Sequence, residues 1–431
     1  MSDNFSSAAL AQFPPTRQAA LSRLAEVRPA AYASSRNHLQ GSVTRLSPYL
    51  THGLMSLPEV ALTVAARQKV HLEHKLVQEL GWREFFHHVW RHQGEAIFTS
   101  LHAGPRPDAD YLAVLPDDIR QARTGVPVID AAVRTLYATG WLHNHARMWL
   151  ASYVVHVRGV HWRAGADWLV AHLLDGDLAS NHLSWQWIAG TGSHKPYLFN
   201  AENVARYVGT VSGWASPGSV VDTDYATLEA WARGTAALPA VAVAASGKGV
   251  DEPALHHTLP AGLPAPLPMP TAKAVAKREV WLVHPWALAD APHAASPDAL
   301  RLGVWPAEFH ARWQWSAARW LFVATRMAAI TRQTAWADST QLQQALAGAA
   351  SVRCTDNGHL PAGWPAAWRQ PAPRLLPDPA KACSSFSQFW RQATQGAERL
   401  TDLPGWAAGG RVDNAAGGAD DGASDPGLFD D

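Results

Sequence analysis

The sequence predicts a mainly α-helical domain followed by a smaller α/β domain. Apolar residues recur at helical spacing across residues 1–215, for example from Ile129 to Leu136. Short apolar runs suited to buried strands begin only at residues 280–283 and 302–305, where they alternate with a helical pattern. Hydrophobic residues make up 47% of the chain and charged residues 17%, which is typical of a folded chain rather than a disordered one.

The elements follow in order along the chain. Residues 149–157 and 168–174 repeat the helical pattern, and Pro127 stands where the first turn of a helix tolerates a missing N–H. Residues 216–275 are rich in Ala, Pro and Gly, which predicts a linker. Strands are expected at 280–283, 302–305, 335–336 and 352–354, and a helix from 309 to about 330. The predicted units are 1–215, 216–275, 276–400 and a disordered acidic tail at 401–431.

Composition excludes several classes of protein. Basic and acidic residues balance at 36 each, so the total charge does not indicate a nucleic-acid-binding protein. The two cysteines, Cys354 and Cys383, cannot form a disulfide framework or a four-cysteine metal site, and they fit a reducing cytoplasm. We expect neither a secretory signal nor a membrane span, because the N-terminal segment has an acid and no basic residue before its short apolar run, and the chain has no run of 18 apolar residues.

Tryptophan is the anomaly of the composition, with 21 residues. Most of them are expected to fill the core. Indole is nevertheless one of the side chains most readily oxidised by one electron, so a redox role for a few of them is open.

Two N-terminal motifs place polar side chains on helices. In TRLSPYL, residues 44–50, Ser47 at a cap and Pro48 at the first helical position predict a helix start, whose free N–H groups suit a phosphate. A plain capped helix explains the same residues. In ELGWREFFHH, residues 79–88, the side chains of Glu79, Trp82 and Arg83 share one helical face, which offers a hydrogen-bond acceptor, an aromatic ring and a cation. A solvated face explains the charges, but the Trp is less expected there.

Two later motifs bring histidines, an arginine and acids. His143 and His145 raise the possibility of a metal, but neither HExxH nor a cysteine pair accompanies them, and we expect no metal. Arg147 needs a carboxylate if it is buried. DGDLASNHLSWQW, residues 175–187, supplies two acids, and paired carboxylates can act as hydrolytic acid and base. An Arg partner would instead lower the pKa of an Asp, which suits an anchor rather than a general acid.

Together these four motifs resemble the FAD-binding domain of the photolyase/cryptochrome family. The similarity runs from about Tyr32 to Tyr207 and keeps the order and spacing of the motifs. The matching segments are TRLSPYL, ELGWREFF, TGVPVIDAAVRTLYATGWLHNHARM and DGDLASNHLSWQW. Four ordered matches of this length are highly specific, whereas any one alone is not. The resemblance implies an all-helical domain that holds a U-folded FAD.

The resemblance implies a set of cofactor-binding residues. Arg147 and Asp175 match an ion pair against the isoalloxazine ring, and Asn181 matches the residue that faces its N5 nitrogen. An amide there can donate or accept a hydrogen bond. Val43 departs from the family, which often has Thr at that position near the pyrophosphate. The expected set is Tyr32, Thr44, Leu46, Ser47, Glu79, Arg83, Asn144, Arg147, Asp175, Asp177 and Asn181.

The resemblance also implies a substrate site. The family's cyclobutane-dimer enzymes surround a flipped dinucleotide with a Glu, an Asn, a Met and two Trp, and all five are matched. The matches are Glu79, Asn144, Met148, Trp82 and Trp187. Enzymes for (6-4) lesions carry paired histidines at two of these positions, so that substrate is disfavoured. His145 replaces an Arg that commonly contacts DNA phosphate, which weakens the expected affinity for DNA.

The resemblance implies electron transfer as well. Trp185 and Trp162 match the two inner members of the family's electron-hopping chain and, with Glu79 and Asn181, form the expected catalytic set. The outer member is absent, because Ile119 stands near its place. Trp141 or Trp149 is a guess at its replacement.

The order of domains departs from the family. Its members usually begin with an α/β domain that binds an antenna pigment, whereas this chain begins almost directly at the flavin domain. Residues 280–395 weakly resemble the missing domain. The matching segments are VWLV at 280–283, LADAP at 288–292, RWQW at 312–315 and FSQFW at 386–390. The resemblance implies a permuted order, with a degenerate, Rossmann-like antenna domain at 276–400 and a pigment that stays unassigned.

Three hypotheses follow for function. The first is a blue-light-driven FAD enzyme, a deoxyribodipyrimidine photo-lyase that splits cyclobutane pyrimidine dimers in UV-damaged DNA. The second is a cryptochrome-like photoreceptor that binds FAD and repairs nothing, which the balanced charge and His145 favour. The third is an interaction protein that kept the helical scaffold and lost the flavin. We expect a cytoplasmic monomer without a membrane partner.

Overall fold

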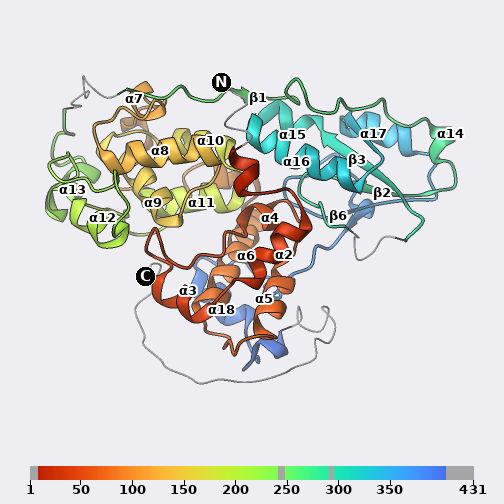
Figure 1. The fold of residues 1–431 in the computed structure, drawn as a ribbon, viewed down its shortest axis with the longest axis horizontal. Coiled ribbons are helices and arrows are strands. Elements are labelled where there is room, and N and C mark those ends of the chain that lie inside the picture. Colours follow the sequence, from red (N-terminus) through yellow and green to blue (C-terminus); the bar gives the residue numbers. More distant parts are fainter. Residues whose placement is uncertain (1–7, 241–247, 291–295, 404–431) are drawn as a thin grey trace.

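The computed structural model describes residues 8–240, 248–290 and 296–403 (Figure 1). Residues 8–240 are built from helices, and the β-pairing within that range is an isolated bridge between Leu112 and Val160. The elements are α2 (Arg17–Ala25), α3 (Pro29–Ser35), α4 (Ser47–Thr51), α5 (Leu57–Ala65), α6 (Lys75–Gln93), η1 (Gly94–Phe98), η2 (Asp108–Asp110), α7 (Asp117–Arg120), α8 (Pro127–Thr139), α9 (Asn144–Ser152), η3 (Tyr153–Val157), α10 (Trp162–His172), α11 (Leu178–Ala189), α12 (Ala201–Val208) and α13 (Tyr225–Ala232).

Local sequence explains the helices around the site. Pro127 occupies the first turn of α8, as predicted, and Gly140 ends this helix in the left-handed conformation that glycine adopts most easily. The predicted helix at 149–157 is α9 continued by the wider turn η3. Asp177 begins α11 by accepting the N–H of Ser180. This local hydrogen bond holds the Asp177 side chain at the N-terminal end of α11, independently of its other partners.

Residues 255–370 form a second unit, here called the α/β layer. Its elements are β1 (Leu255–His256), α14 (Ala272–Val275), β2 (Glu279–Val283), β3 (Leu300–Pro306), α15 (Ala307–Arg312), β4 (Trp315–Ser316), α16 (Ala317–Ile330), β5 (Gln333–Ala337), α17 (Ser339–Leu346), β6 (Ser351–Thr355), η4 (Ala366–Trp368) and β7 (Arg369–Gln370). Five strands form one parallel sheet in the order β5-β3-β2-β6-β7, and all four predicted strands are confirmed. Counted along the chain, this is the 3-2-1-4-5 order of doubly wound sheets.

The predicted helix at 309–330 is wrong as a single element. The chain forms α15 and α16 with β4 between them, because Trp315 and Ser316 pair with β1 and the Ser316 hydroxyl caps α16. The expected linker at 216–275 is also more structured than its composition predicts. It contains α13, whose Leu228 is buried, and α14. Most of the expected acidic tail, from residue 404, lies outside the described residues.

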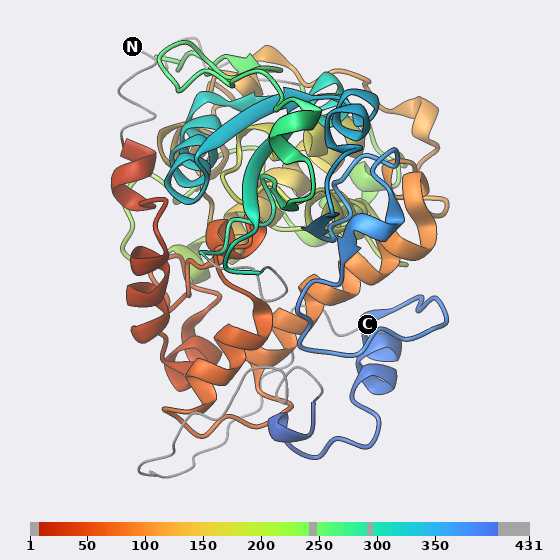
Figure 2. The same cartoon turned by 90° about the vertical axis from the view of Figure 1, so that its right-hand side faces the viewer.

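The chain finally returns to the first helices. Residues 371–403, here called the C-terminal strap, carry α18 (Phe386–Ala393) and η5 (Leu400–Asp402). In Figures 1 and 2 the blue helix α18 lies beside the orange helix α6 rather than on the sheet. Trp390 of α18 packs so closely on Gly81 of α6 that a Cβ at Gly81 would lie 2.6 Å from its ring. The strap therefore ties the end of the described chain to α6.

The hydrophobic core has two parts that do not follow the predicted boundary at residue 215. The first core joins α2–α6 with the α/β layer and the strap, for example Leu54 with Val283 and Phe389. The second core joins α7–α9 with α12 and α13, for example Val133 with Leu228. Helices α10 and α11 contribute residues to both cores and lie along their boundary. In the part of the chain that the structure describes, no helix is long and apolar enough to cross a membrane.

Candidate functional site

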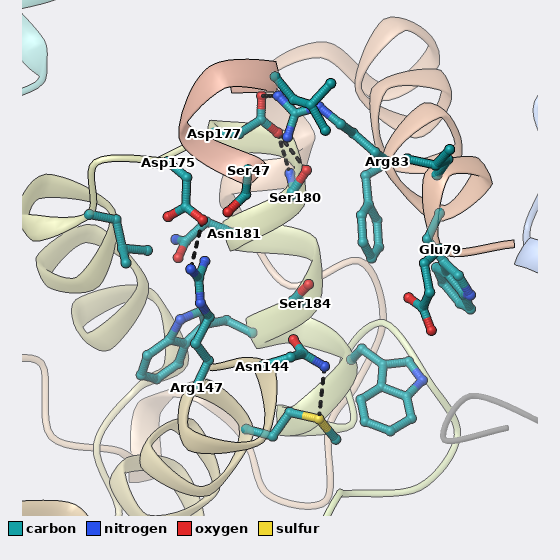
Figure 3. Close-up of a pocket in the computed structure, with 18 of the residues that line it drawn as sticks. Ser47, Glu79, Arg83, Asn144, Arg147, Asp175, Asp177, Ser180, Asn181 and Ser184 are labelled. Carbon is teal, nitrogen blue, oxygen red and sulfur yellow. Dashed lines mark hydrogen bonds and ion pairs between the residues drawn. The ribbon is translucent and has the colours of Figure 1, made fainter. Parts of the chain in front are cut away.

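A pocket lies between the two cores (Figure 3). Its walls come from α3, α4 and α6 on one side and from α9, α10 and α11 on the other, and it encloses about 290 Å³ of space open to water-sized molecules. Among the predicted residues, the following line it: Tyr32, Thr44, Ser47, Glu79, Trp82, Arg83, Asn144, Arg147, Met148, Asp175, Asp177, Asn181, Trp185 and Trp187. Thirteen side chains predicted from four separate motifs, together with Tyr32, thus meet in one cavity.

The predicted ion pair between Arg147 and Asp175 is present. Arg147 Nη2 lies 2.7 Å from Asp175 Oδ2, and Arg147 Nε donates to the carbonyl of Leu142 at 3.0 Å. The other oxygen, Asp175 Oδ1, is buried and has no hydrogen-bond partner among the described residues. A buried carboxylate oxygen without a donor is costly, so this atom calls for a ligand that donates an N–H or O–H.

Asp177 is the most heavily contacted acid of the pocket. Its Oδ2 lies 2.9 Å from His87 Nε2 and 3.5 Å from Arg83 Nη2, and its Oδ1 accepts both the N–H and the hydroxyl of Ser180. Burial alone would raise the pKa of Asp177, but the charges of His87 and Arg83 outweigh burial and hold that pKa well below its usual range. Asp177 is therefore an anionic anchor and not a general acid.

Asn181 and Trp185 stand one helical turn apart on α11. Asn181 Nδ2 donates to the carbonyl of Ala166 at 2.9 Å, so the amide presents Oδ1, an acceptor, as its remaining group. Trp185 is 2% exposed, and its ring packs on Gly165 of α10, where a Cβ would overlap it. The bare backbone at Gly165 allows α10 and α11 to approach closely enough for the indole to reach the pocket wall.

The five predicted substrate residues share the same pocket. Asn144 Nδ2 lies 3.5 Å from Met148 Sδ, one turn further along α9. Burial raises the pKa of Glu79, although the charges of Arg36 and Lys75 oppose it. Arg36 Nε lies 3.7 Å from Glu79 Oε1. A raised pKa favours a protonated carboxyl that can donate a hydrogen bond.

The TRLSPYL motif is only partly as predicted. Helix α4 begins at Ser47 itself, and no side chain caps it. The Ser47 hydroxyl accepts instead from Trp141 Nε1 at 3.1 Å. Leu46 does not line the pocket, because its side chain is 1% exposed and packs in the first core. The expected cap is wrong because Ser47 is the first residue of the helix and Leu46, which has no polar side chain, occupies the cap position.

The structure separates the other predicted aromatic residues. Trp162 is buried in the second core, does not line the pocket and donates its indole N–H to Ser100 Oγ at 3.0 Å. Ile119 is fully buried. Trp141 contacts Phe13, and Trp149 contacts His145 and Phe199; among the described residues, neither indole has a ring contact with Trp162 or Trp185.

His143 and His145 have structural positions. His143 Nδ1 accepts the N–H of His145 and caps α9, and His145 packs on Tyr207 with 4.6 Å between ring centroids. Burial lowers the pKa of His143 to about 4 and that of His145 to about 3, so both rings are neutral near pH 7. At 1% exposure His145 is also out of reach of a DNA phosphate.

Sequence reasoning missed several residues that complete the site. Ser180 and Ser184 line the pocket from α11, and His87 pairs with Asp177. The helical spacing of 177, 180, 181, 184 and 185 on one face could have indicated both serines. His87 stands four residues after Arg83 on α6, which is a weaker signal of the same kind.

Comparison with known proteins shows what this part of the chain is similar to. Residues 76–212 match the family model of the FAD binding domain of DNA photolyase. The chain is 40% identical over 167 residues to a deoxyribodipyrimidine photo-lyase of Streptomyces griseus, covering 38% of this chain and 35% of that protein. It is 33% identical over 171 residues to a chloroplastic/mitochondrial cryptochrome DASH of Oryza sativa subsp. japonica, covering 38% and 29%.

A solved structure of a bacterial class III photolyase from Agrobacterium tumefaciens matches with a TM-score of 0.43 and 25% identity, over 48% of this chain and 46% of that one. The chain spans less than half the length of the curated relatives it matches. The resemblance seen in the sequence is confirmed: residues 76–212 match the FAD binding domain of DNA photolyase, and relatives named deoxyribodipyrimidine photo-lyase align with the chain at 33–40% identity.

Proposed function

We propose that this chain binds FAD in the pocket and uses blue light to split cyclobutane pyrimidine dimers in UV-damaged DNA. One observation carries the proposal. The Arg147–Asp175 ion pair and the Asn181 amide line the same cavity as all five residues expected around a flipped dinucleotide. An isolated helical scaffold would have no physical reason to gather these polar groups between two apolar cores.

The residues fit a flavin. Asp175 Oδ1 is a buried acceptor without a donor among the described residues, and Asn181 Oδ1, on the following helix α11, is a second acceptor. An isoalloxazine ring offers N–H donors on a flat apolar body, which matches acceptors set among Leu169, Leu173 and Ile188. Tyr32, Thr44, Ser47 and Arg83 would hold the rest of the cofactor.

Bound FAD supplies the absorption of blue light and one electron for the substrate. The protein's part is to hold both partners. The indoles of Trp82 and Trp187 replace the stacking that a flipped dinucleotide loses, and Asn144 and Met148 contact its edge. Glu79 donates a hydrogen bond to the dimer from its protonated form, which the raised pKa favours, while the dimer carries the extra electron. Two carbon–carbon bonds of the cyclobutane ring break and the electron returns, so the reaction is redox-neutral.

The test begins with the purified protein. Its absorption spectrum before and after blue light reports flavin, and a colourless protein that does not take up added FAD would instead support a scaffold without cofactor. Repair is then measured as restored thymines in a dimer-containing oligonucleotide, with fully reduced protein under blue light. No restored thymine in that assay contradicts the proposal.

Glu79→Gln is the matched variant, because it keeps the shape and removes the acidic proton. We expect repair to fall by about 10- to 100-fold, the loss that follows from one strong hydrogen bond to a charged group. Binding of FAD is expected to be unchanged. Equal repair by Glu79→Gln and the wild type would remove Glu79 from the mechanism. A dark incubation serves as the control.

A cryptochrome-like photoreceptor is the second candidate. The buried, neutral His145 supports it, because the protein lacks a cation where the family commonly contacts DNA phosphate. DNA binding separates the two functions. A repair enzyme must bind dimer-containing DNA with an affinity that falls steeply with salt, whereas a photoreceptor need not. FAD binding without DNA binding would favour the photoreceptor.

The order of units is part of the proposal. We infer that residues 276–400 are a permuted counterpart of the α/β domain that usually precedes the flavin domain. The 3-2-1-4-5 order of its parallel strands supports this assignment, and the pigment it would hold stays unassigned. A monomeric, cytoplasmic protein remains our expectation.

A further inference from the structure

The loop at residues 173–177, between α10 and α11, carries the two aspartates of the pocket, and much of its support comes from outside the flavin domain. Arg319 of α16 reaches across from the α/β layer. Its Nη2 donates to the carbonyl of Gly176 at 2.6 Å, and its Nη1 donates to the carbonyl of Val170 at 3.3 Å. Gly176 stands between Asp175 and Asp177, so the guanidinium grips the backbone between the two acids.

Arg319 is an unusual cation because it is buried without an ion-pair partner. It is 1% exposed, and among the described residues no carboxylate oxygen lies within 4.0 Å of it. Burial lowers its pKa to about 9, although the charges of Asp175 and Asp177 oppose this. The face of Trp315 lies 4.1 Å from the guanidinium carbon. A buried charge needs compensation, and here it comes from the two loop acids at longer range.

A second residue of the α/β layer holds the other end of the loop. His359 Nε2 lies 3.2 Å from the N–H of Leu178, and its Nδ1 lies 2.6 Å from Asn357 Oδ1. Because an amide N–H can only donate, Nε2 accepts and Nδ1 carries the proton, so this ring is neutral. The ring stacks on Trp286, with centroids 4.8 Å apart and planes inclined by 9°. The imidazole is thus fixed in orientation before it meets the loop.

We infer that Arg319 and His359 are positioning residues of the flavin pocket. Through them the α/β layer fixes the positions of Asp175 and Asp177, and the charge of Arg319 contributes to the electrostatic field at these two acids. The inference rests on the proposed binding of FAD. The guanidinium packs tightly against the loop backbone, since a Cβ at Gly176 would lie 2.5 Å from Arg319 Nη1. The α/β layer then influences the cofactor site through these direct contacts, and this influence does not depend on any pigment bound by the α/β layer.

The chain offers a matched control on the same helix. Arg326 lies seven residues after Arg319 on α16 and is also buried, at 5% exposure. It donates to the carbonyl of Leu288 at 2.9 Å and pairs with Asp290 at 2.6 Å. Its charge is therefore neutralised locally, and neither of these partners belongs to the loop at 173–177. Arg326→Met removes an equally buried guanidinium from α16 and leaves the pocket loop untouched.

The experiment compares Arg319→Met, Arg319→Lys and Arg326→Met in the full-length chain. The affinity for FAD is measured by titrating the apoprotein, the flavin midpoint potential by spectroelectrochemistry, and folding by circular dichroism. We expect Arg319→Met to weaken FAD binding at least tenfold and to lower the midpoint potential, because a cation behind the site is lost. Arg319→Lys is expected to recover most of the potential, since it keeps the charge. Arg326→Met is expected to change the affinity less than threefold.

The outcomes are distinct. A folded Arg319→Met protein with wild-type affinity and potential overturns the inference, and so does an equal loss in Arg326→Met, which would indicate a general effect of destabilising α16. If Arg319→Met does not fold, His359→Leu decides, because leucine still packs on Trp286 but cannot accept the N–H of Leu178. Its midpoint potential must then differ from that of the wild type. Failure of the wild type itself to bind FAD contradicts the proposed function instead.

Discussion

Glu84 is a buried carboxylate that stands on α6 outside the pocket and binds the C-terminal strap. It is 5% exposed, and its two oxygens accept the N–H groups of Leu375 and Leu376 at 2.7 and 2.8 Å. Burial raises its pKa to about 7, although Arg374 and the two N–H groups oppose the shift. The folded protein therefore holds this proton more tightly than the unfolded chain does, and the charged form is disfavoured by folding.

This pKa predicts a pH-dependent stability. Between the ordinary value of 4.5 and about 7 the folded state binds more protons than the unfolded state, so the free energy of unfolding falls as pH rises through this window. The expected loss is on the order of 3 kcal/mol. Urea unfolding of the wild type and Glu84→Gln at several pH values between 4.5 and 8 checks it. The difference between the two proteins should change by that amount, and parallel pH profiles would contradict the assignment.

Gly165 makes a prediction at the pocket wall. A Cβ there would overlap the buried ring of Trp185. Alanine is favoured over glycine in a helix by about 1 kcal/mol, yet we expect Gly165→Ala to destabilise the protein by about 1–3 kcal/mol through overpacking. The displaced indole should also lower the affinity for FAD. Urea unfolding and FAD titration measure both effects, and the double variant Gly165→Ala with Trp185→Phe should regain part of the stability. A more stable Gly165→Ala protein with unchanged affinity would refute the packing argument.

At the scale of elements, α6 has two functional faces. Glu79, Trp82 and Arg83 face the pocket, whereas Gly81 and Glu84 dock the C-terminal strap. The first face was predictable, because residues three and four apart share a helical face and their types point to binding. The second was not, since its partners lie about 290 residues away in the sequence and include backbone N–H groups that any residue supplies.

Trp82 connects these two faces. Phe386 of α18 stacks on its ring, with centroids 4.1 Å apart and planes inclined by 10°. Such a contact contributes about 0.5–1.5 kcal/mol and fixes the indole for stacking on a base. We expect Phe386→Leu to weaken binding of a dimer-containing oligonucleotide by about 2- to 12-fold and to leave FAD affinity unchanged. Arg391→Ala, at an exposed position of the same helix, is the control. Wild-type DNA affinity in Phe386→Leu would show that the stack does not matter for the substrate.

At the scale of the whole molecule, the sequence predicts the features that depend on residue types in a local motif or run. The pairing of Arg147 with Asp175 followed from motif order, and the four strands followed from short apolar runs. The division of the helices between two cores could not be predicted from the sequence. The packing of α2–α6 on the α/β layer depends on scattered apolar residues, such as Leu54 and Trp281, that form no motif. The role of Arg319 could not be predicted from the sequence either. It donates to backbone carbonyl oxygens about 140 residues away, and every residue type supplies such a carbonyl.

The position of the pocket between the two cores gives the last prediction. Leu76 and Leu80 of α6 belong to the first core, whereas Trp185 and Ile188 of α11 belong to the second, and all four line the cavity. A ligand bound there contacts both cores, so it should suppress the local opening of both at once. We expect bound FAD to slow amide hydrogen exchange in α6 and in α11.

Hydrogen-exchange mass spectrometry of the protein with and without FAD measures this effect. Helix α17 is the internal control, because it packs near β5 and contributes no residue to the pocket. Its exchange should change little, while α6 and α11 are protected together by up to the binding free energy, about 2.7 kcal/mol at a hundredfold excess of FAD over its Kd. Protection confined to α11 would mean that the cofactor binds the second core alone, and the cavity between the cores would then not be the flavin site.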